Sequence, residues 1–75
     1  MMLEQIIELI ADELSLEAST INRNTNLEED LNVDSLDVVE LVMRIEETFD
    51  IEISDEAAAN LKTVEDILNY VEANK

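Results

Sequence analysis

Apolar residues recur at helical spacing near both ends of the chain. Near the N-terminus they fall at i, i+3, i+4, i+7 and i+11, in the order Leu3, Ile6, Ile7, Ile10 and Leu14. The same kind of spacing returns near the C-terminus in Val64, Ile67, Leu68 and Val71. An α-helix turns through about 100° per residue, so this spacing places the apolar side chains on one face. The pattern therefore predicts an amphipathic helix at each end of the chain.

The middle of the chain predicts a longer helix over residues 35–49, preceded by Asp34, a residue type that favours the N-cap position. The positions expected to face the core are Val38, Leu41, Val42, Ile45 and Phe49. Leu36, Val39 and Met43 form a second group, the apolar stripe, which lies about 120° or more from the centre of the first. A small bundle seldom buries both sides of one helix. The apolar stripe is therefore either covered by a loop or exposed to a partner.

Acidic residues surround the apolar stripe and form what we call the acidic rim: Asp34, Asp37, Glu40, Glu46 and Glu47. Large apolar residues with charged flanks are typical of interaction surfaces. Apolar contacts would supply affinity, and the rim would attract and orient a basic partner. We therefore expect the stripe and the rim to form a partner-binding surface. Arg44 is placed to pair with Glu40 at i, i+4, and this pair would slightly weaken the negative charge of the rim.

Two further helix starts and a long connection complete the predicted fold. Ser54 is placed to cap a short helix that extends to about Asn60. Thr63 and Asp66 are spaced as a capping box for the last helix, with Asp in place of the usual Glu. The first connection has roughly twenty residues without a clear period, which is uncommon in a compact domain. Its expected apolar anchors are Ile21, Leu27, Leu31 and Val33. We expect an all-α fold, a small bundle of three main helices plus one short helix with a long first loop, formed by residues 1–75 as a single domain.

The charge of the chain narrows the choice of partners. Twenty Asp and Glu residues against four Lys and Arg residues give a formal net charge of −16. This charge repels phosphate and anionic headgroups, which excludes nucleic-acid binding through a basic patch and argues against docking on anionic lipid. Proteins with basic surfaces are the expected partners, although high charge also keeps a small protein soluble. Charged residues interrupt the apolar runs, so we expect no signal peptide, no membrane insertion, and a monomer in the cytoplasm.

Ser35 opens the middle helix within the tripeptide Asp34-Ser35-Leu36. A serine nucleophile needs a base to accept its proton, most often histidine, and the chain contains no histidine and no cysteine. We therefore assign no catalytic residue and do not expect an enzyme. The N-terminus of a helix instead favours an attached phosphate, because its free N–H groups and its dipole stabilise negative charge. Ser35 is thus the candidate site for a phosphate-containing group.

Segments along nearly the whole chain resemble the acyl carrier proteins. Residues 29–37 are similar to the segment that holds the attachment serine of that family. Residues 40–43 with 45–53 are similar to its recognition helix and the exit from it, and residues 63–66 with 70–71 resemble its last helix. An Asp-Ser-Leu tripeptide alone is a weak signal, but a match in register with these flanking segments is specific.

Two positions depart from the family pattern. Asn32 stands where the family usually has Gly, and Ser54 stands where it usually has Pro. Asn is one of the few other residues that tolerate a positive φ, so we expect Asn32 to adopt one and to preserve the turn before the helix. Ser54 exchanges a rigid φ for a capping hydroxyl. Neither change touches Ser35.

The resemblance implies a carrier. A separate phosphopantetheinyl transferase would join 4′-phosphopantetheine from coenzyme A to Ser35, and the thiol of this cofactor would carry acyl chains as thioesters. Enzymes of fatty acid biosynthesis with basic docking surfaces would bind the apolar stripe and the acidic rim. The resemblance implies that the growing chain is sheltered among Leu41, Val42, Ile45, Phe49, Ile53, Ala58, Leu61 and Leu68. The acidic middle helix favours the fatty acid pathway, and a polyketide or other specialised pathway is the alternative.

Three other interpretations compete with the carrier. Asp30, Asn32 and Asp34 match the first half of an EF-hand loop. The sixth position is Ser35 rather than Gly and the twelfth is Leu41 rather than Glu, so we expect no dedicated metal site. Hydrolysis by paired carboxylates needs two acids with different protonation states in one cleft, whereas many acids on a small bundle usually form a solvated surface. An acidic interaction module without a cofactor is the stronger alternative.

Overall fold

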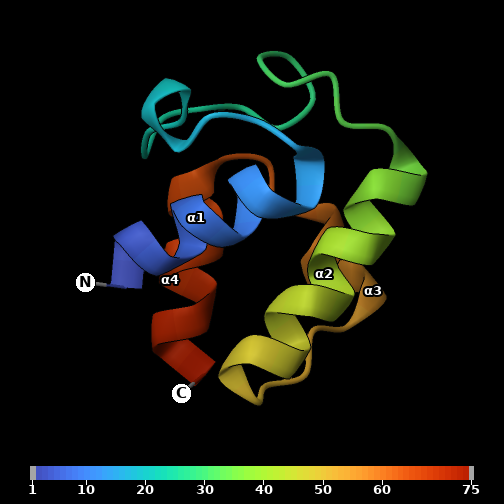
Figure 1. Cartoon of the computed structure of the whole chain (residues 1–75). Helices are drawn as coiled ribbons and strands as arrows, with labels where there is room; N and C mark the ends of the chain where they lie inside the picture. Colours follow the sequence, from blue (N-terminus) through green and yellow to red (C-terminus); the bar gives the residue numbers. More distant parts are fainter. Residues whose placement is uncertain (1, 75) are drawn as a thin grey trace.

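Helices account for most of the chain in the computed structural model, which describes residues 2–74 (Figure 1). In chain order the elements are α1 (Met2–Leu14), the 3₁₀ turn η1 (Ala18–Thr20), α2 (Ser35–Phe49), α3 (Asp55–Ala59) and α4 (Val64–Asn74). Within the described part of the chain there is no β-strand, and the predicted all-α fold of three main helices and one short helix is confirmed. None of the described helices combines the length and the apolarity that crossing a bilayer requires.

Side-chain caps explain why α2 and α3 begin where they do. Asp34 is extended at φ −92° and ψ 178°, and its carboxylate accepts a hydrogen bond of 2.9 Å from the backbone N–H of Asp37. The Asp37 carboxylate in turn accepts from the N–H of Asp34 at 3.4 Å, which completes a capping box. The Ser54 hydroxyl accepts from the N–H of Ala57 at 3.1 Å. Both predicted caps, Asp34 and Ser54, are therefore confirmed.

The start of α4 is a capping box built with aspartate. The Thr63 hydroxyl accepts a hydrogen bond of 3.1 Å from the N–H of Asp66. The Asp66 carboxylate accepts from the N–H groups of Thr63 and Lys62, each at 3.1 Å. The shorter side chain of Asp thus serves in place of the usual Glu, as the spacing predicts.

The core forms where α1 packs against both α2 and α4. The largest fully buried side chains come from all three helices: Ile6, Ile10, Leu41, Ile45, Val64, Ile67 and Val71. The predicted core-facing stripes therefore do supply the centre of the core. Several of their other members are only half-buried, namely Leu3, Ile7, Leu14, Val38, Val42 and Phe49, while Leu9 and Ala11 are buried without having been predicted.

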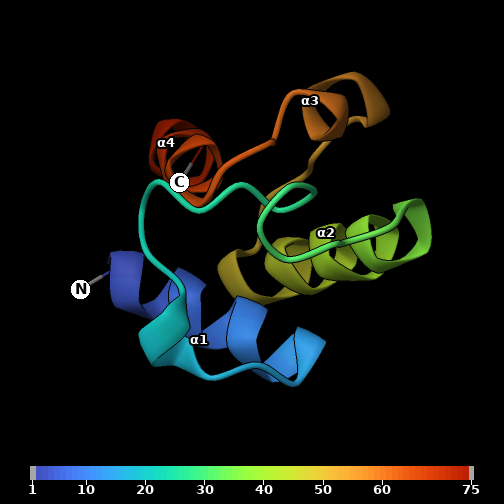
Figure 2. The same cartoon turned by 90° about the horizontal axis from the view of Figure 1, so that it is seen from above.

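The long first loop lies across one end of the helices (Figures 1 and 2). Three of its four predicted anchors are buried, namely Ile21, Leu27 and Val33, and Leu31 is half-buried. Backbone hydrogen bonds also tie the loop to the segment that leads into α4. The N–H of Leu27 donates to the carbonyl of Lys62 at 2.9 Å, and the N–H of Val64 donates to the carbonyl of Thr25 at 3.1 Å. These bonds satisfy backbone groups that the loop buries.

Among residues 2–74, three residues adopt the left-handed conformation, in a chain that contains no glycine. Asn32 has φ 54°, as predicted, and Ser15 and Asp50 have φ 57° and 54°. Ser15 follows α1 and Asp50 follows α2, the position where a left-handed residue commonly ends a helix. Leu16 follows Ser15, and its N–H donates to the carbonyl of Ala11 at 2.8 Å, which closes the end of α1.

Candidate functional site

Ser35 is the first residue of α2, and its side chain is exposed. Its hydroxyl makes no hydrogen bond with any residue from 2 to 74. The two carboxylates closest to it in the sequence, those of Asp34 and Asp37, are occupied in the capping box. The geometry therefore holds the backbone of Ser35 in a defined place while leaving its hydroxyl free to be modified.

Two backbone hydrogen bonds and a buried side chain hold the turn before α2. The left-handed Asn32 donates its N–H to the carbonyl of Glu28 at 3.1 Å. Val33 is buried and donates its N–H to the carbonyl of Leu27, also at 3.1 Å. A buried side chain and two backbone bonds thus set the direction in which the chain reaches Ser35.

A hollow of about 430 Å³ opens beside Ser35 between α2 and α3. Its lining is made of Leu27, Glu28, Ser35, Val38, Val39, Asp55, Ala58, Ala59, Leu61 and Lys62. Of the residues expected to shelter an acyl chain, Ala58 and Leu61 line this hollow, whereas Leu41 and Ile45 are fully buried in the core. The hollow thus joins the candidate attachment serine to an apolar space at the edge of the core.

The apolar stripe is exposed to solvent. Leu36, Val39 and Met43 have exposed fractions of 67%, 54% and 54%, so the long loop does not cover them. Glu40 and Glu47 are exposed beside Met43, and the three residues line one shallow hollow. The structure therefore brings the stripe and part of the rim together on the face of α2 that the bundle leaves free.

Arg44 does not pair with Glu40, which corrects the i, i+4 interpretation. Its guanidinium lies against α1, where it donates to the Asp12 carboxylate at 2.6 Å and to the Glu13 carboxylate at 3.1 Å. The hydrogen bonds to Asp12 and then Glu13 raise the pKa of Arg44 above its ordinary value. The i, i+4 rule considers one helix alone, whereas here a neighbouring helix offers two carboxylates. The negative charge of Glu40 is consequently left unpaired within residues 2–74.

Glu46 has a structural contact on the other side of α2. Its carboxylate accepts a hydrogen bond of 2.8 Å from the N–H of Ile53 in the connection to α3, and its side chain is half-buried. Glu40 and Glu47 make no such bond with the described residues. The rim is therefore divided, with Asp34, Asp37 and Glu46 bonded to backbone and Glu40 and Glu47 free.

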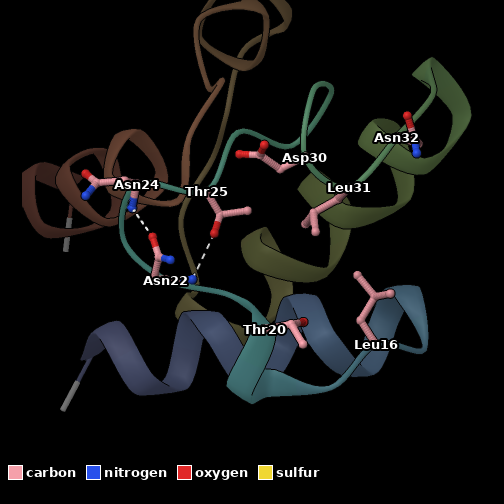
Figure 3. Close-up of a pocket in the computed structure, with 8 residues that line it drawn as sticks. All are labelled: Leu16, Thr20, Asn22, Asn24, Thr25, Asp30, Leu31 and Asn32. Carbon is pink, nitrogen blue, oxygen red and sulfur yellow. Dashed lines mark hydrogen bonds between the residues drawn. The ribbon is translucent and has the colours of Figure 1, made fainter.

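A second and larger hollow, of about 730 Å³, lies between the long loop and the end of α1 (Figure 3). Leu16 and Leu31 point into it in Figure 3. The N–H of Asn22 donates to the Thr25 hydroxyl at 2.9 Å, and the N–H of Asn24 donates to the side-chain oxygen of Asn22 at 2.8 Å. Ser35 does not line this hollow, whose polar groups are used to shape the loop. No pattern in the sequence had indicated it.

In the folded chain, the carboxylates of the partial EF-hand match each bond to a different backbone N–H group. The Asp30 carboxylate accepts from the N–H of Asn26 at 2.8 Å, and that of Asp34 caps α2. Residues 2–74 bring together no group of three or more side chains suited to hold a metal ion. Each carboxylate instead stabilises a turn of its own segment.

Comparison with known proteins shows similarity along nearly the whole chain. A protein-family model described as the phosphopantetheine attachment site matches residues 4–71. The chain is 54% identical over 74 residues to the acyl carrier protein of Onion yellows phytoplasma (strain OY-M), covering 99% of this chain and 97% of that relative. It is 50% identical over 72 residues to the acyl carrier protein of Helicobacter hepaticus (strain ATCC 51449 / 3B1), covering 96% and 95%. A solved structure of the acyl carrier protein from Enterococcus faecalis matches with a TM-score of 0.83 at 34% identity, covering 97% of this chain and 92% of that chain.

Proposed function

The chain belongs to the acyl carrier protein family, whose members are carriers rather than enzymes, and we propose on this basis that Ser35 bears its 4′-phosphopantetheine. The observation that carries this proposal is the exposed, unbonded hydroxyl at the first position of α2. The free N–H groups of that helix end favour the phosphate that modification would add.

The residues around Ser35 fit this group. The phosphate end of the cofactor would lie at the start of α2. The acyl chain that the cofactor carries would enter the hollow, whose lining includes Val38, Ala58 and Leu61. The chain has no cysteine, and the cofactor supplies the thiol that carries acyl groups as thioesters. Burial of an acyl chain in the hollow would be favoured by about 25 cal/mol for each Å² of apolar surface removed from water.

The exposed face of α2 is the proposed docking surface for the enzymes that load and use the carrier. The apolar stripe would supply contact area, and Glu40 and Glu47 would attract a basic partner. A phosphopantetheinyl transferase must reach Ser35 at the end of this face, so we include it among the partners. We propose that residues 1–75 act as one carrier domain, as a monomer in the cytoplasm.

Fatty acid biosynthesis is the pathway that we propose. The free acidic residues beside the stripe support it, because they give partners with basic docking surfaces a complementary charge. A polyketide or other specialised pathway is the second candidate. Extension of an acyl chain on the loaded protein by fatty acid synthesis enzymes is the expected result, and extension only by enzymes of a specialised pathway would favour the second candidate.

Intact mass measurement after incubation with coenzyme A and a phosphopantetheinyl transferase tests the attachment site. The wild-type protein is expected to gain one phosphopantetheine, and Ser35→Ala is expected to gain none. Ser54→Ala is the matched control, because it removes a capping hydroxyl at the start of a different helix and should still be loaded. Modification of Ser35→Ala would refute the assignment.

A further inference from the structure

Lys62 has no ion pair, unlike the other basic residues within the part of the chain that the structure describes. The chain has four basic residues, of which Arg23, Arg44 and Lys62 lie within the part that the structure describes. Arg23 pairs with Glu65 at 3.4 Å, and Arg44 pairs with carboxylates of α1. Among residues 2–74, the ammonium group of Lys62 has neither an ion pair nor a hydrogen bond. Among residues 2–74, this leaves one basic side chain available to an added anion.

The fold places this lysine at the hollow beside Ser35. Both residues belong to the lining of the same 430 Å³ space, Ser35 from α2 and Lys62 from the segment before α4. The backbone of Lys62 is held firmly, since its carbonyl accepts from the N–H of Leu27 and its N–H donates to Asp66. Its side chain is exposed. The position of the residue is thus fixed while its ammonium group is free to move within reach of the hollow.

An attached phosphodiester would meet a negative environment. Glu28 and Asp55 line the hollow, and Asp34 and Asp37 flank the serine. The added negative charge would be repelled by these carboxylates, and a nearby cation would offset that repulsion. The helix N-terminus supplies only partial charges, which act over its first turn. A full positive charge on another lining residue of the hollow would attract the phosphate toward the apolar space.

We propose that the Lys62 ammonium group binds the phosphodiester of the cofactor arm on Ser35 and positions the arm over the hollow between α2 and α3. This inference rests on Ser35 being the attachment site. Lys62 acts here as a positioning residue, because it contacts the phosphate and not the thioester that reacts. An exposed pair of charges contributes little to stability, so the expected effect is a preferred orientation with a small thermal signature.

The test compares apo and holo protein for the wild type, Lys62→Gln and Lys62→Arg. Nuclear magnetic resonance of the Lys62 Cε group is expected to show a shift on loading of the wild type at low salt, and that shift should shrink at high salt. The change in melting temperature on loading should be less favourable in Lys62→Gln than in the wild type by about 1–5 °C at low salt. Lys62→Arg should restore the wild-type change. Arg23→Gln is the matched control, since it removes the same charge from a residue that does not line the hollow.

The outcomes distinguish a failure of the role proposed for Lys62 from a failure of Ser35 as the attachment site. Intact mass first establishes that the wild type is loaded. If the melting temperature of Lys62→Gln then changes on loading as it does in the wild type, and the Lys62 resonance of the wild type does not move, the role of Lys62 is refuted and Ser35 stands. If the wild type is not loaded at all, both proposals fail. Inorganic phosphate added to the apo protein should leave the Lys62 resonance nearly unmoved at matched ionic strength. A shift as large as that of the holo protein would refute the assignment to the tethered phosphate.

Discussion

Arg44 and Asp12 join α2 to α1 through a hydrogen-bonded ion pair, in which Nη2 donates to Oδ2 over 2.6 Å. The second guanidinium nitrogen reaches Glu13 at 3.1 Å, so one arginine bonds two carboxylates on the neighbouring helix. Arg44 lines the same shallow hollow as Glu40 and Met43, but its ion pairs go to α1, so Glu40 beside the apolar stripe has no ion-pair partner among residues 2–74. One side chain thus links the packing of the bundle to the charge of its proposed docking surface.

Arg44→Gln is expected to lower the melting temperature at low salt, and the loss should decrease as salt is added, because the pair is exposed and screened. The hydrogen bonds to Asp12 and Glu13 raise the pKa of Arg44 above its ordinary value, so the contribution should be constant across neutral pH and be lost as pH rises through that raised value. Lys62→Gln, which removes the same charge without breaking an ion pair, is the control. Thermal melts that show the same decrease for both variants would mean that the α1 contact contributes nothing.

Met43→Ala and Ile45→Ala should separate binding from stability on one helix. Ile45 is fully buried, so its truncation should lower the free energy of unfolding by about 2–5 kcal/mol. Met43 is 54% exposed, so its truncation should leave the melting temperature nearly unchanged and speed dissociation from a phosphopantetheinyl transferase. Binding kinetics and thermal melts provide the comparison. A Met43→Ala variant that binds normally but melts much lower would show that the apolar stripe belongs to the core.

Glu47→Lys should slow association with a basic partner by about two- to tenfold at low salt and flatten its salt dependence, since rim charges mainly steer the encounter. Glu72→Lys makes the same change on α4, away from the stripe, and should alter association less. Stopped-flow or surface-based kinetics over a range of salt concentrations would measure the difference. Equal slopes for the two variants would indicate that only the net charge matters.

Ser15→Gly is expected to raise the free energy of unfolding by about 0.5–1 kcal/mol, because a left-handed conformation is costly for serine and free of steric strain for glycine. The gain is a net value, since glycine also gives the unfolded chain more freedom. Gln5→Gly within α1 is the opposite control and should lower stability by about 0.5 kcal/mol. Chemical denaturation of both variants checks the sign. A loss in Ser15→Gly would show that the side chain contributes more than the backbone strain costs.

The positions of the helices follow from local features of the sequence, which is why they could be predicted closely. Asp34, Ser54 and Thr63 each bond to N–H groups of the helix that they begin, and those partners lie within three residues. The exposure of Met43 also follows from spacing along a single helix. Ser35 could be singled out from its place at a helix start in a chain without histidine.

Contacts between distant segments could not be read in the same way. Nothing in the spacing of Arg44 indicates that α1 brings Asp12 beside it. The bonds between Leu27 and Lys62 and between Thr25 and Val64 likewise depend on how the loop crosses the bundle. Asp50 is a different case, because a chain without glycine must end its helices with another residue, and Asp tolerates a left-handed conformation.

The absence of a buried side chain in α3 has a consequence for the cargo. The cap of this short helix and the bond from Ala58 to Ser54 are local, and its Ala57 and Ala58 side chains are only half-buried against the core, while the loop and α4 are tied together by separate bonds. A segment with few buried contacts opens at low cost, so α3 should fluctuate while the rest stays folded, and amide exchange at Ala58 should outpace that at Leu27. Because Ala58 and Ala59 line the hollow, such motion should change the volume of the hollow. We therefore expect this carrier to admit acyl chains of different lengths without repacking its core.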